Sequence, residues 1–311
     1  MRVVSLIRKF KWLSCAQIVL LYASSLSAQT AKPTAEVPFE FVHNQIVVRA
    51  NIGGKGPFNL LIDTNTDPSA IDSATAKELG LDVGSKGSVA TGGGPEKNVV
   101  YPARLPSVEL GTVTARDVLA ATISLSKISD RIGVPIHGVL GYSFLKDRII
   151  QIDYAHTVLR FYAESPYPHV SLAPNTVNVI AFRMRREDGD VLIDSVFVNG
   201  EKMVAALDTG ASSTFTLTPE ATALLGIEGE ALKDAPQTSI GYNGVHQTKQ
   251  GVLKSVRLGR MTIDSPQAAF WLPDTGHDKK KFQVNIGNGF FQDFLMTFDF
   301  RNKMVVFERV D

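Results

Sequence analysis

Two aspartates, each followed by a threonine, are the residues of this chain best suited to carry chemistry. Asp63 stands in Leu61-Ile-Asp-Thr-Asn-Thr-Asp67, and Asp208 stands in Ala206-Leu-Asp-Thr-Gly-Ala-Ser-Ser213. Each aspartate closes a short apolar run of the kind that forms a buried β-strand. A carboxylate in that place costs free energy unless nearby donors compensate it. We therefore expect both loops to be built around their carboxyl groups.

A pair of such carboxyl groups can perform acid–base chemistry. Two carboxylates about 3 Å apart cannot both ionise, so they share one proton. One then acts as a base toward water while the other, protonated, polarises a carbonyl group. If a pseudo-two-fold axis relates the two halves of the chain, Asp63 and Asp208 meet at that axis. The competing interpretation is that both aspartates only cap turns.

The residues that follow each aspartate are expected to support the active-site loops. Asn65 and Gly210 can adopt positive φ in a tight turn, which would direct backbone N–H groups at the carboxylates. Hydroxyl groups are available nearby from Thr64, Thr66, Thr209 and Ser212.

Three blocks of sequence recur in the same order, at offsets of 145, 148 and 146 residues. Such a repeat predicts two homologous lobes, over residues 37–165 and 176–311, with a proline-containing linker that begins at Glu164. The matched blocks are Phe58–Asn65 with Met203–Gly210, Leu105–Gly111 with Leu253–Gly259, and Gly141–Asp147 with Gly287–Asp293.

Most of the chain has the pattern of strands separated by turns. Short runs rich in β-branched and aromatic residues alternate with Gly, Pro, Asn and Asp, which predicts a mostly β protein with two barrel-like lobes. Strands are expected at Gln45–Ala50, Phe58–Ile62, Ile149–Ile152, Val191–Val198 and Met304–Phe307. Helices are expected at Ser73–Leu79, Pro219–Leu225, Ser143–Asp147 and Gly289–Phe294.

These features together resemble the aspartic proteases, both pepsin-like and retropepsin-like. The resemblance rests on Asp208-Thr-Gly-Ala-Ser212, on the weaker Asp63-Thr-Asn-Thr66, and on an element ending in glycine in each lobe, Val139-Leu-Gly141 and Asn285-Ile-Gly287. It covers nearly all of the chain after the N-terminal segment. It implies the acid protease fold, an active site between the lobes, a catalytic pair of Asp63 and Asp208, and no cofactor. It also implies that the threonines bond across the lobe interface.

The resemblance further implies glycine-rich hairpins that close over a substrate. By position, their tips are expected within Val89–Pro95 and Ser239–Val245. Glycine there permits hinge motion and close approach of a peptide backbone. The implied flap residues are Gly92, Gly93, Gly94, Gly241, Tyr242 and Gly244.

Departures from the family pattern leave a second hypothesis open. Asn65 replaces the glycine of the first motif, so the alternative is a peptide- or protein-binding module that keeps the fold and has lost turnover. Asp67 adds a third carboxylate, which raises the apparent pKa of the pair if it points inward and is a solvated turn residue if it points outward. Asp274-Thr-Gly276 is a further copy of the tripeptide, but its charged surroundings indicate a surface loop. Asp153 and Asp299 also recur between the lobes and are expected to cap turns.

The N-terminus has the order of a secretory signal peptide. Basic residues precede a mostly apolar stretch from Trp12 to Leu26, and small residues lead to Ala28. We expect residues 1–28 to be removed, which predicts an extracytoplasmic protein, periplasmic or secreted. An uncleaved membrane anchor is the alternative, although the stretch is shorter than the roughly 20 residues that span a bilayer. The single cysteine, Cys15, lies in this segment.

Charge and composition narrow the expected partners. The formal net charge is +1, so no basic excess indicates nucleic acid or an anionic membrane surface. The six histidines are scattered without ligand spacing, so no metal site is predicted. The expected partner is a peptide or protein substrate, with no membrane association after signal cleavage. Two lobes in one chain predict a monomer with an internal lobe pair, and the other possibility is that each lobe pairs with another chain.

Overall fold

The computed structural model describes residues 31–90, 92–167, 177–184, 189–227, 236–273 and 282–309. The predicted signal peptide, Cys15 and Asp274 lie outside these residues. None of the helices in the described part of the chain has the length and apolar character needed to cross a bilayer.

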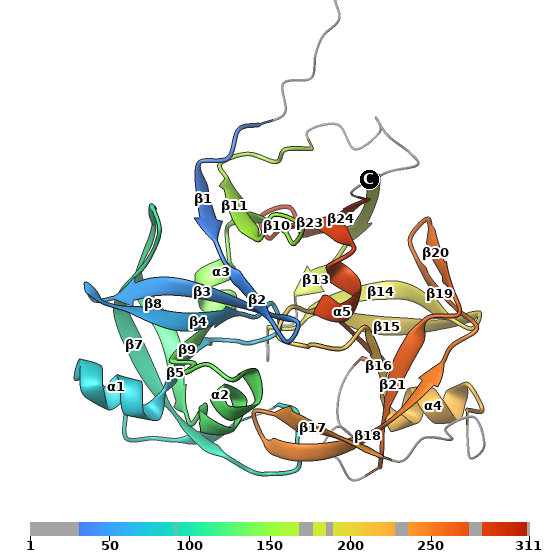
Figure 1. The fold of residues 1–311 in the computed structure, drawn as a ribbon, viewed down its shortest axis with the longest axis horizontal. Helices are drawn as coiled ribbons and strands as arrows, with labels where there is room; N and C mark the ends of the chain where they lie inside the picture. Colours follow the sequence, from blue (N-terminus) through green and yellow to red (C-terminus); the bar gives the residue numbers. More distant parts are fainter. Residues whose placement is uncertain are drawn as a thin grey trace, which may run out of the picture. The chain divides into compact units, whose positions relative to one another are not determined.

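The first lobe is an eight-stranded sheet in the order β2-β3-β4-β9-β5-β8-β7-β6, and it curls so that β3 also pairs with β7 (Figure 1, blue to green). Strand β4 runs parallel to β9, and both end in apolar residues that are buried on the two faces of the sheet. The bounds are β2 (Glu40–Val42), β3 (Gln45–Ile52), β4 (Lys55–Ile62), β5 (Ser69–Asp72), β6 (Ser88–Val89), β7 (Val99–Leu110), β8 (Val113–Ile123) and β9 (Gly138–Leu140).

The second lobe repeats this plan in the order β17-β18-β21-β16-β22-β15-β14-β19-β20, with β13 paired to β14 (Figure 1, yellow to red). Strand β15 runs parallel to β22, as β4 does to β9. The bounds are β13 (Arg183–Met184), β14 (Val191–Val198), β15 (Glu201–Asp208), β16 (Phe215–Leu217), β17 (Gln237–Gly241), β18 (Gly244–Val252), β19 (Ser255–Leu258), β20 (Met261–Asp264), β21 (Gln267–Trp271) and β22 (Val284–Gly287).

A six-stranded sheet takes strands from both halves of the chain, in the order β1-β11-β10-β23-β24-β12. At its centre β10 and β23 pair antiparallel, with Gln151 opposite Thr297. The predicted fold class, mostly β with two homologous lobes, is therefore confirmed. The bounds are β1 (Ala35–Pro38), β10 (Ile149–Asp153), β11 (Val158–Tyr162), β12 (Val177–Ala181), β23 (Phe294–Asp299) and β24 (Met304–Arg309).

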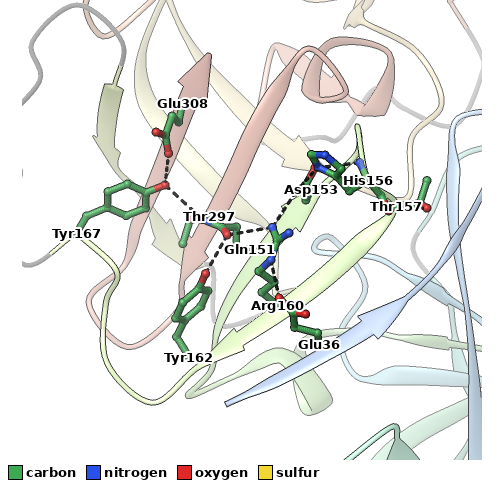
Figure 2. Close-up of polar contacts among 10 residues, drawn as sticks. All are labelled: Glu36, Gln151, Asp153, His156, Thr157, Arg160, Tyr162, Tyr167, Thr297 and Glu308. Atoms are coloured by element: carbon green, nitrogen blue, oxygen red, sulfur yellow. Dashed lines mark hydrogen bonds and ion pairs between the residues drawn. The ribbon is translucent and has the colours of Figure 1, made fainter. Parts of the chain in front are cut away.

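Polar side chains connect the strands of this shared sheet (Figure 2). Gln151 donates to Thr297 Oγ1 at 3.1 Å and accepts from the Tyr162 hydroxyl at 3.0 Å. Tyr167 donates to Glu308 Oε2 at 2.6 Å. Because Gln151 and Thr297 come from opposite halves of the chain, the network ties those halves together through buried hydrogen bonds.

The helices are short, and their bounds are α1 (Ser73–Leu79), α2 (Ser126–Ile132), α3 (Tyr142–Leu145), α4 (Pro219–Leu224) and α5 (Asn288–Phe291). Helix α1 has its predicted bounds, with Asp72 as N-cap and Gly80 in the left-handed region at its end. The predicted α3 and α5 began one residue too late and were too long. Each helix begins directly after a glycine that occupies its N-cap position. Helix α2 was not predicted.

Candidate active site

The loops after β4 and β15 are locked together by two threonines. The Thr64 hydroxyl donates to the Leu207 carbonyl at 2.7 Å and accepts from the Thr209 N–H at 3.1 Å. The Thr209 hydroxyl donates to the Ile62 carbonyl at 2.9 Å and accepts from the Thr64 N–H at 3.0 Å. Each lobe therefore satisfies buried backbone groups of the other, and the strand ends that carry the two aspartates meet.

Asp63 is buried and accepts hydrogen bonds at both carboxylate oxygens. The Asn65 N–H donates to Oδ1 at 2.7 Å, and the Thr66 hydroxyl donates to Oδ2 at 2.6 Å. The Tyr242 hydroxyl, from the second lobe, also donates to Oδ2 at 3.0 Å. Three donors from both lobes therefore hold this carboxyl group in place.

Asp208 lies in a different electrostatic environment. The Gly210 N–H donates to its Oδ1 at 2.8 Å, and the Asn285 amide donates to its Oδ2 at 2.8 Å. Burial, followed by the negative charge of Asp63, raises the pKa of Asp208 to about 7, and the charge of Asp190 acts in the same direction. Asp208 therefore holds a proton below neutral pH.

Gly210 is required by close approach and not by backbone conformation. A Cβ added to it would lie 2.4 Å from Asp63 Oδ2, so the first carboxylate rests against the backbone of the second loop. We expected positive φ at Asn65 and Gly210, and this was wrong, because neither residue lies in the left-handed region. The loops instead direct their N–H groups at the carboxylates with ordinary backbone angles.

Asn65 contacts the opposite lobe. Its Oδ1 accepts from the Val191 N–H at 3.1 Å, so the side chain that replaces glycine forms an interlobe hydrogen bond. The exposed Asp67 lies near Gly189, whose added Cβ would be 2.3 Å from the Asp67 Cβ. The third carboxylate that acts on Asp208 is Asp190, and this role was not predicted.

Residues at the start of β3 and in the turn before it donate hydrogen bonds from the first lobe to the Asp208 loop. Gln45 donates to the Gly210 carbonyl at 3.0 Å, and Asn44 donates to the Ser212 carbonyl at 2.9 Å. Asn288 adds donors to Asn44 O at 2.8 Å and to Thr209 O at 2.6 Å. Ser212, expected to support the loop through its hydroxyl, presents its carbonyl, while Ala211 occupies the place that Thr66 has in the first lobe.

The two expected hairpin tips lie against each other. The Asn243 N–H donates to the Gly93 carbonyl at 2.8 Å, and the Glu96 N–H donates to the Asn243 carbonyl at 2.8 Å. Asn98 donates to the Tyr242 carbonyl at 2.9 Å. Side chains at three of these glycines would collide with the opposite tip, because an added Cβ would lie 2.2 Å from Asn243 O at Gly94, 2.3 Å from Gly93 O at Gly241 and 2.3 Å from Glu96 Oε1 at Gly244. At Gly92 an added Cβ would make a tight contact, 3.2 Å from the Tyr242 Cβ.

The other recurring aspartates cap turns, as expected. Asp153 accepts from the His156 N–H at 3.0 Å, and Asp299 accepts from the Asn302 N–H at 2.9 Å. In the described part of the chain, no group of three or more His, Cys, Asp or Glu side chains is arranged to hold a metal ion.

Three interactions with the Asp208 loop were not predicted from the sequence, namely those of Asn285, Asp190 and Gln45. A signal was available for Asn285, because it interrupts the internal repeat at the position where the first lobe has Val139. Gln45 acts across the lobe interface, and Asp190 acts on Asp208 from elsewhere in the second lobe; no local pattern marks either effect.

Comparison with known proteins agrees with the repeat. A family model described as Aspartyl protease matches residues 48–144 and again residues 195–290, together more than half of the chain. Among solved structures, a retropepsin-like aspartic protease from Rickettsia conorii is 25% identical, with a TM-score of 0.34, over 43% of this chain and 92% of its own. Basic 7S globulin from soybean is 12% identical, with a TM-score of 0.48, over 88% of this chain and 94% of its own. A comparison with curated proteins found no match.

Proposed function

This chain belongs to the aspartyl protease family, and we propose that it is an aspartic endopeptidase that hydrolyses peptide bonds with Asp63 and Asp208. The observation that carries the proposal is the unequal environment of the two carboxyl groups. Asp63 accepts hydrogen bonds at both oxygens from its own loop, whereas burial and neighbouring charge raise the pKa of Asp208 to about 7. A buried carboxyl group that keeps its proton near neutral pH can serve as the acid of a pair, with its partner as the base.

In the proposed reaction, Asp63 is the base and Asp208 is the acid. Asp63 takes a proton from a water molecule, whose oxygen attacks the carbonyl carbon of the peptide. Asp208 gives its proton to the carbonyl oxygen, which produces a tetrahedral diol. When the C–N bond breaks, Asp63 gives its proton to the departing amine and Asp208 recovers a proton from a diol hydroxyl. The pair ends in its starting protonation state.

Access of a substrate requires the two hairpin tips to separate. They are joined by the backbone hydrogen bonds of Asn243, and Tyr242 donates directly to the carboxylate of Asp63. A peptide that reaches the pair must displace this hydroxyl. We infer that the hairpins open to admit an extended peptide and close over it, as lids of active sites commonly do.

The alternative, a binding module without turnover, rested on Asn65 in place of glycine. The hydrogen bond from Val191 N–H to Asn65 Oδ1 gives this side chain a structural role in aligning the loops. Asn65 therefore supplies no argument against catalysis. A non-catalytic module remains an outcome of the experiment that follows.

The test is a cleavage assay with the purified protein and a diverse peptide mixture from about pH 3 to pH 7. New termini are read by mass spectrometry, and circular dichroism checks that each variant is folded. We expect cleavage by the wild type and none by Asp208→Asn. Asp274→Asn is the matched control, since it changes the same Asp-Thr-Gly tripeptide where no catalytic role is predicted. A folded wild type that cleaves nothing at any pH would contradict the proposal and favour the binding module.

We propose further that the enzyme acts outside the cytoplasm, as a monomer that pairs its own lobes. The first part rests on the signal-like sequence of residues 1–28. The second is supported by the reciprocal hydrogen bonds of Thr64 and Thr209 within one chain. N-terminal sequencing of the protein exported by a bacterial host, and its mass by light scattering, check the two parts separately.

A further inference from the structure

The two carboxyl groups are held alike at one oxygen and differently at the other. At Oδ1, each accepts a backbone N–H, from Asn65 at 2.7 Å and from Gly210 at 2.8 Å. At Oδ2, Asp63 accepts from the hydroxyl of Thr66. The residue three positions after Asp208 is Ala211, which has no hydroxyl to offer.

Asn285, on a neighbouring strand, supplies the hydrogen-bond donor for Asp208 Oδ2 instead. Strand β22 runs parallel to β15 with Asn285 beside Ala206, and the amide Nδ2 lies 2.8 Å from Asp208 Oδ2. In the first lobe, the equivalent place on β9 beside Leu61 is taken by Val139, which is fully buried in an apolar cluster. The amide is thus a departure from the repeat at a position that touches the second carboxyl group.

The surroundings of Asn285 argue against a purely structural role. The residue is 6% exposed, and its Oδ1 has no hydrogen-bond partner within the described residues. Burying a carboxamide with one end unsatisfied costs free energy that a valine at this position would not. A cost of this kind is expected where a polar group serves function.

We propose that Asn285 is the positioning residue of Asp208, whose Oδ2 it holds in place of the missing hydroxyl. The inference rests on the proposed function, because it assigns Asn285 to the acid of the catalytic pair. With Gly210 fixing Oδ1 and Asn285 fixing Oδ2, rotation of the carboxyl group about its Cβ–Cγ bond is restrained. The donated hydrogen bond also lowers the pKa of Asp208 against burial and the charges of Asp63 and Asp190, which raise it.

The test replaces Asn285 by the residue that the repeat supplies, Asn285→Val. We expect the alkaline limb of the pH profile of kcat/KM to move upward by about one pH unit, the amount that loss of one hydrogen bond to a charged group permits. We also expect kcat at the optimum to fall about ten-fold, because the acid loses its orientation.

Rescue provides the matched control. Adding Ala211→Thr to Asn285→Val restores a hydroxyl at the position that Thr66 has in the first lobe. The double variant is expected to recover at least half of the shift and of the lost kcat. If Asn285→Val does not fold, Asn285→Ala carries the same test with a smaller side chain.

A second readout separates this inference from the proposed function. Aspartate labelled with 13C at the side-chain carboxyl allows the Asp208 titration to be followed by NMR without substrate, its signal being assigned by loss in Asp208→Asn. An upward shift in Asn285→Val supports the inference even if the wild type cleaves no peptide. An unchanged or downward shift overturns it, and so does a variant whose only defect is a lower melting temperature.

Discussion

Replacing the hydroxyl of Thr64 by a methyl group, in Thr64→Val, should separate the stability of the lobe interface from the chemistry of the carboxyl groups. The hydroxyl makes two of the four hydrogen bonds of the threonine lock, to Leu207 O and from Thr209 N–H. Thr64 is 3% exposed and Thr209 0%, so water cannot replace the lost partner. Leaving two buried backbone groups unsatisfied, at about 1–3 kcal/mol each, predicts a loss of about 2–6 kcal/mol in the free energy of unfolding.

The assay is urea unfolding followed by circular dichroism, with equal m-values required for the comparison. Thr64→Ser keeps the hydroxyl and should lose less than half as much stability as Thr64→Val. Thr209→Val should match Thr64→Val, and the double variant should lose less than the sum, because the two side chains belong to one hydrogen-bond network. A loss below about 0.5 kcal/mol for Thr64→Val, typical of surface substitutions, would refute the lock.

Three further predictions concern the carboxyl groups directly. Gly210→Ala places a Cβ where it would lie 2.4 Å from Asp63 Oδ2, so kcat/KM should fall at least about 100-fold in a folded protein, and a smaller fall would contradict the close approach. Tyr242→Phe removes the hydroxyl that a substrate must displace, so KM should fall about 2- to 10-fold with kcat unchanged; a lower kcat at constant KM would instead make Tyr242 part of the reaction. Because the folded-state pKa of Asp208 is raised to about 7, the folded protein binds a proton that the unfolded chain has released, and stability should decline as pH rises from about 4 to about 7. Asp208→Asn should flatten this decline of melting temperature, and an identical pH dependence in both proteins would contradict the assignment.

Local sequence patterns were sufficient for several elements of both lobes. Strand β14 has the bounds predicted from its apolar run, and so does helix α1, whose Asp72 cap and Gly80 terminus are visible in the sequence. The internal repeat identified both aspartates as ends of matched strands, and the structure places them at the joined loops. Helix α2 has the same length as α1, but it was missed because its residues are mostly polar and its N-cap, Leu125, makes no side-chain cap hydrogen bond.

The contacts that distinguish the two carboxyl groups could not be predicted from local pattern. Tyr242 reaches Asp63 across 179 positions of sequence, and Asn285 reaches Asp208 across 77. Such contacts depend on how the hairpin and strand β22 are placed by tertiary packing. The symmetry of the repeat predicts where the carboxyl groups meet, while the departures from symmetry give each carboxyl group different hydrogen-bond donors.

The most direct test of the central claim compares Asp63→Asn, Asp208→Asn and the double variant on one peptide that the wild type cleaves. Residues that act as one catalytic unit are strongly non-additive. We predict that each single variant lowers kcat/KM by at least about 1,000-fold and that the double variant is no worse than either. Retention of a tenth or more of the wild-type activity by either folded single variant would contradict the claim that Asp63 and Asp208 work as a pair.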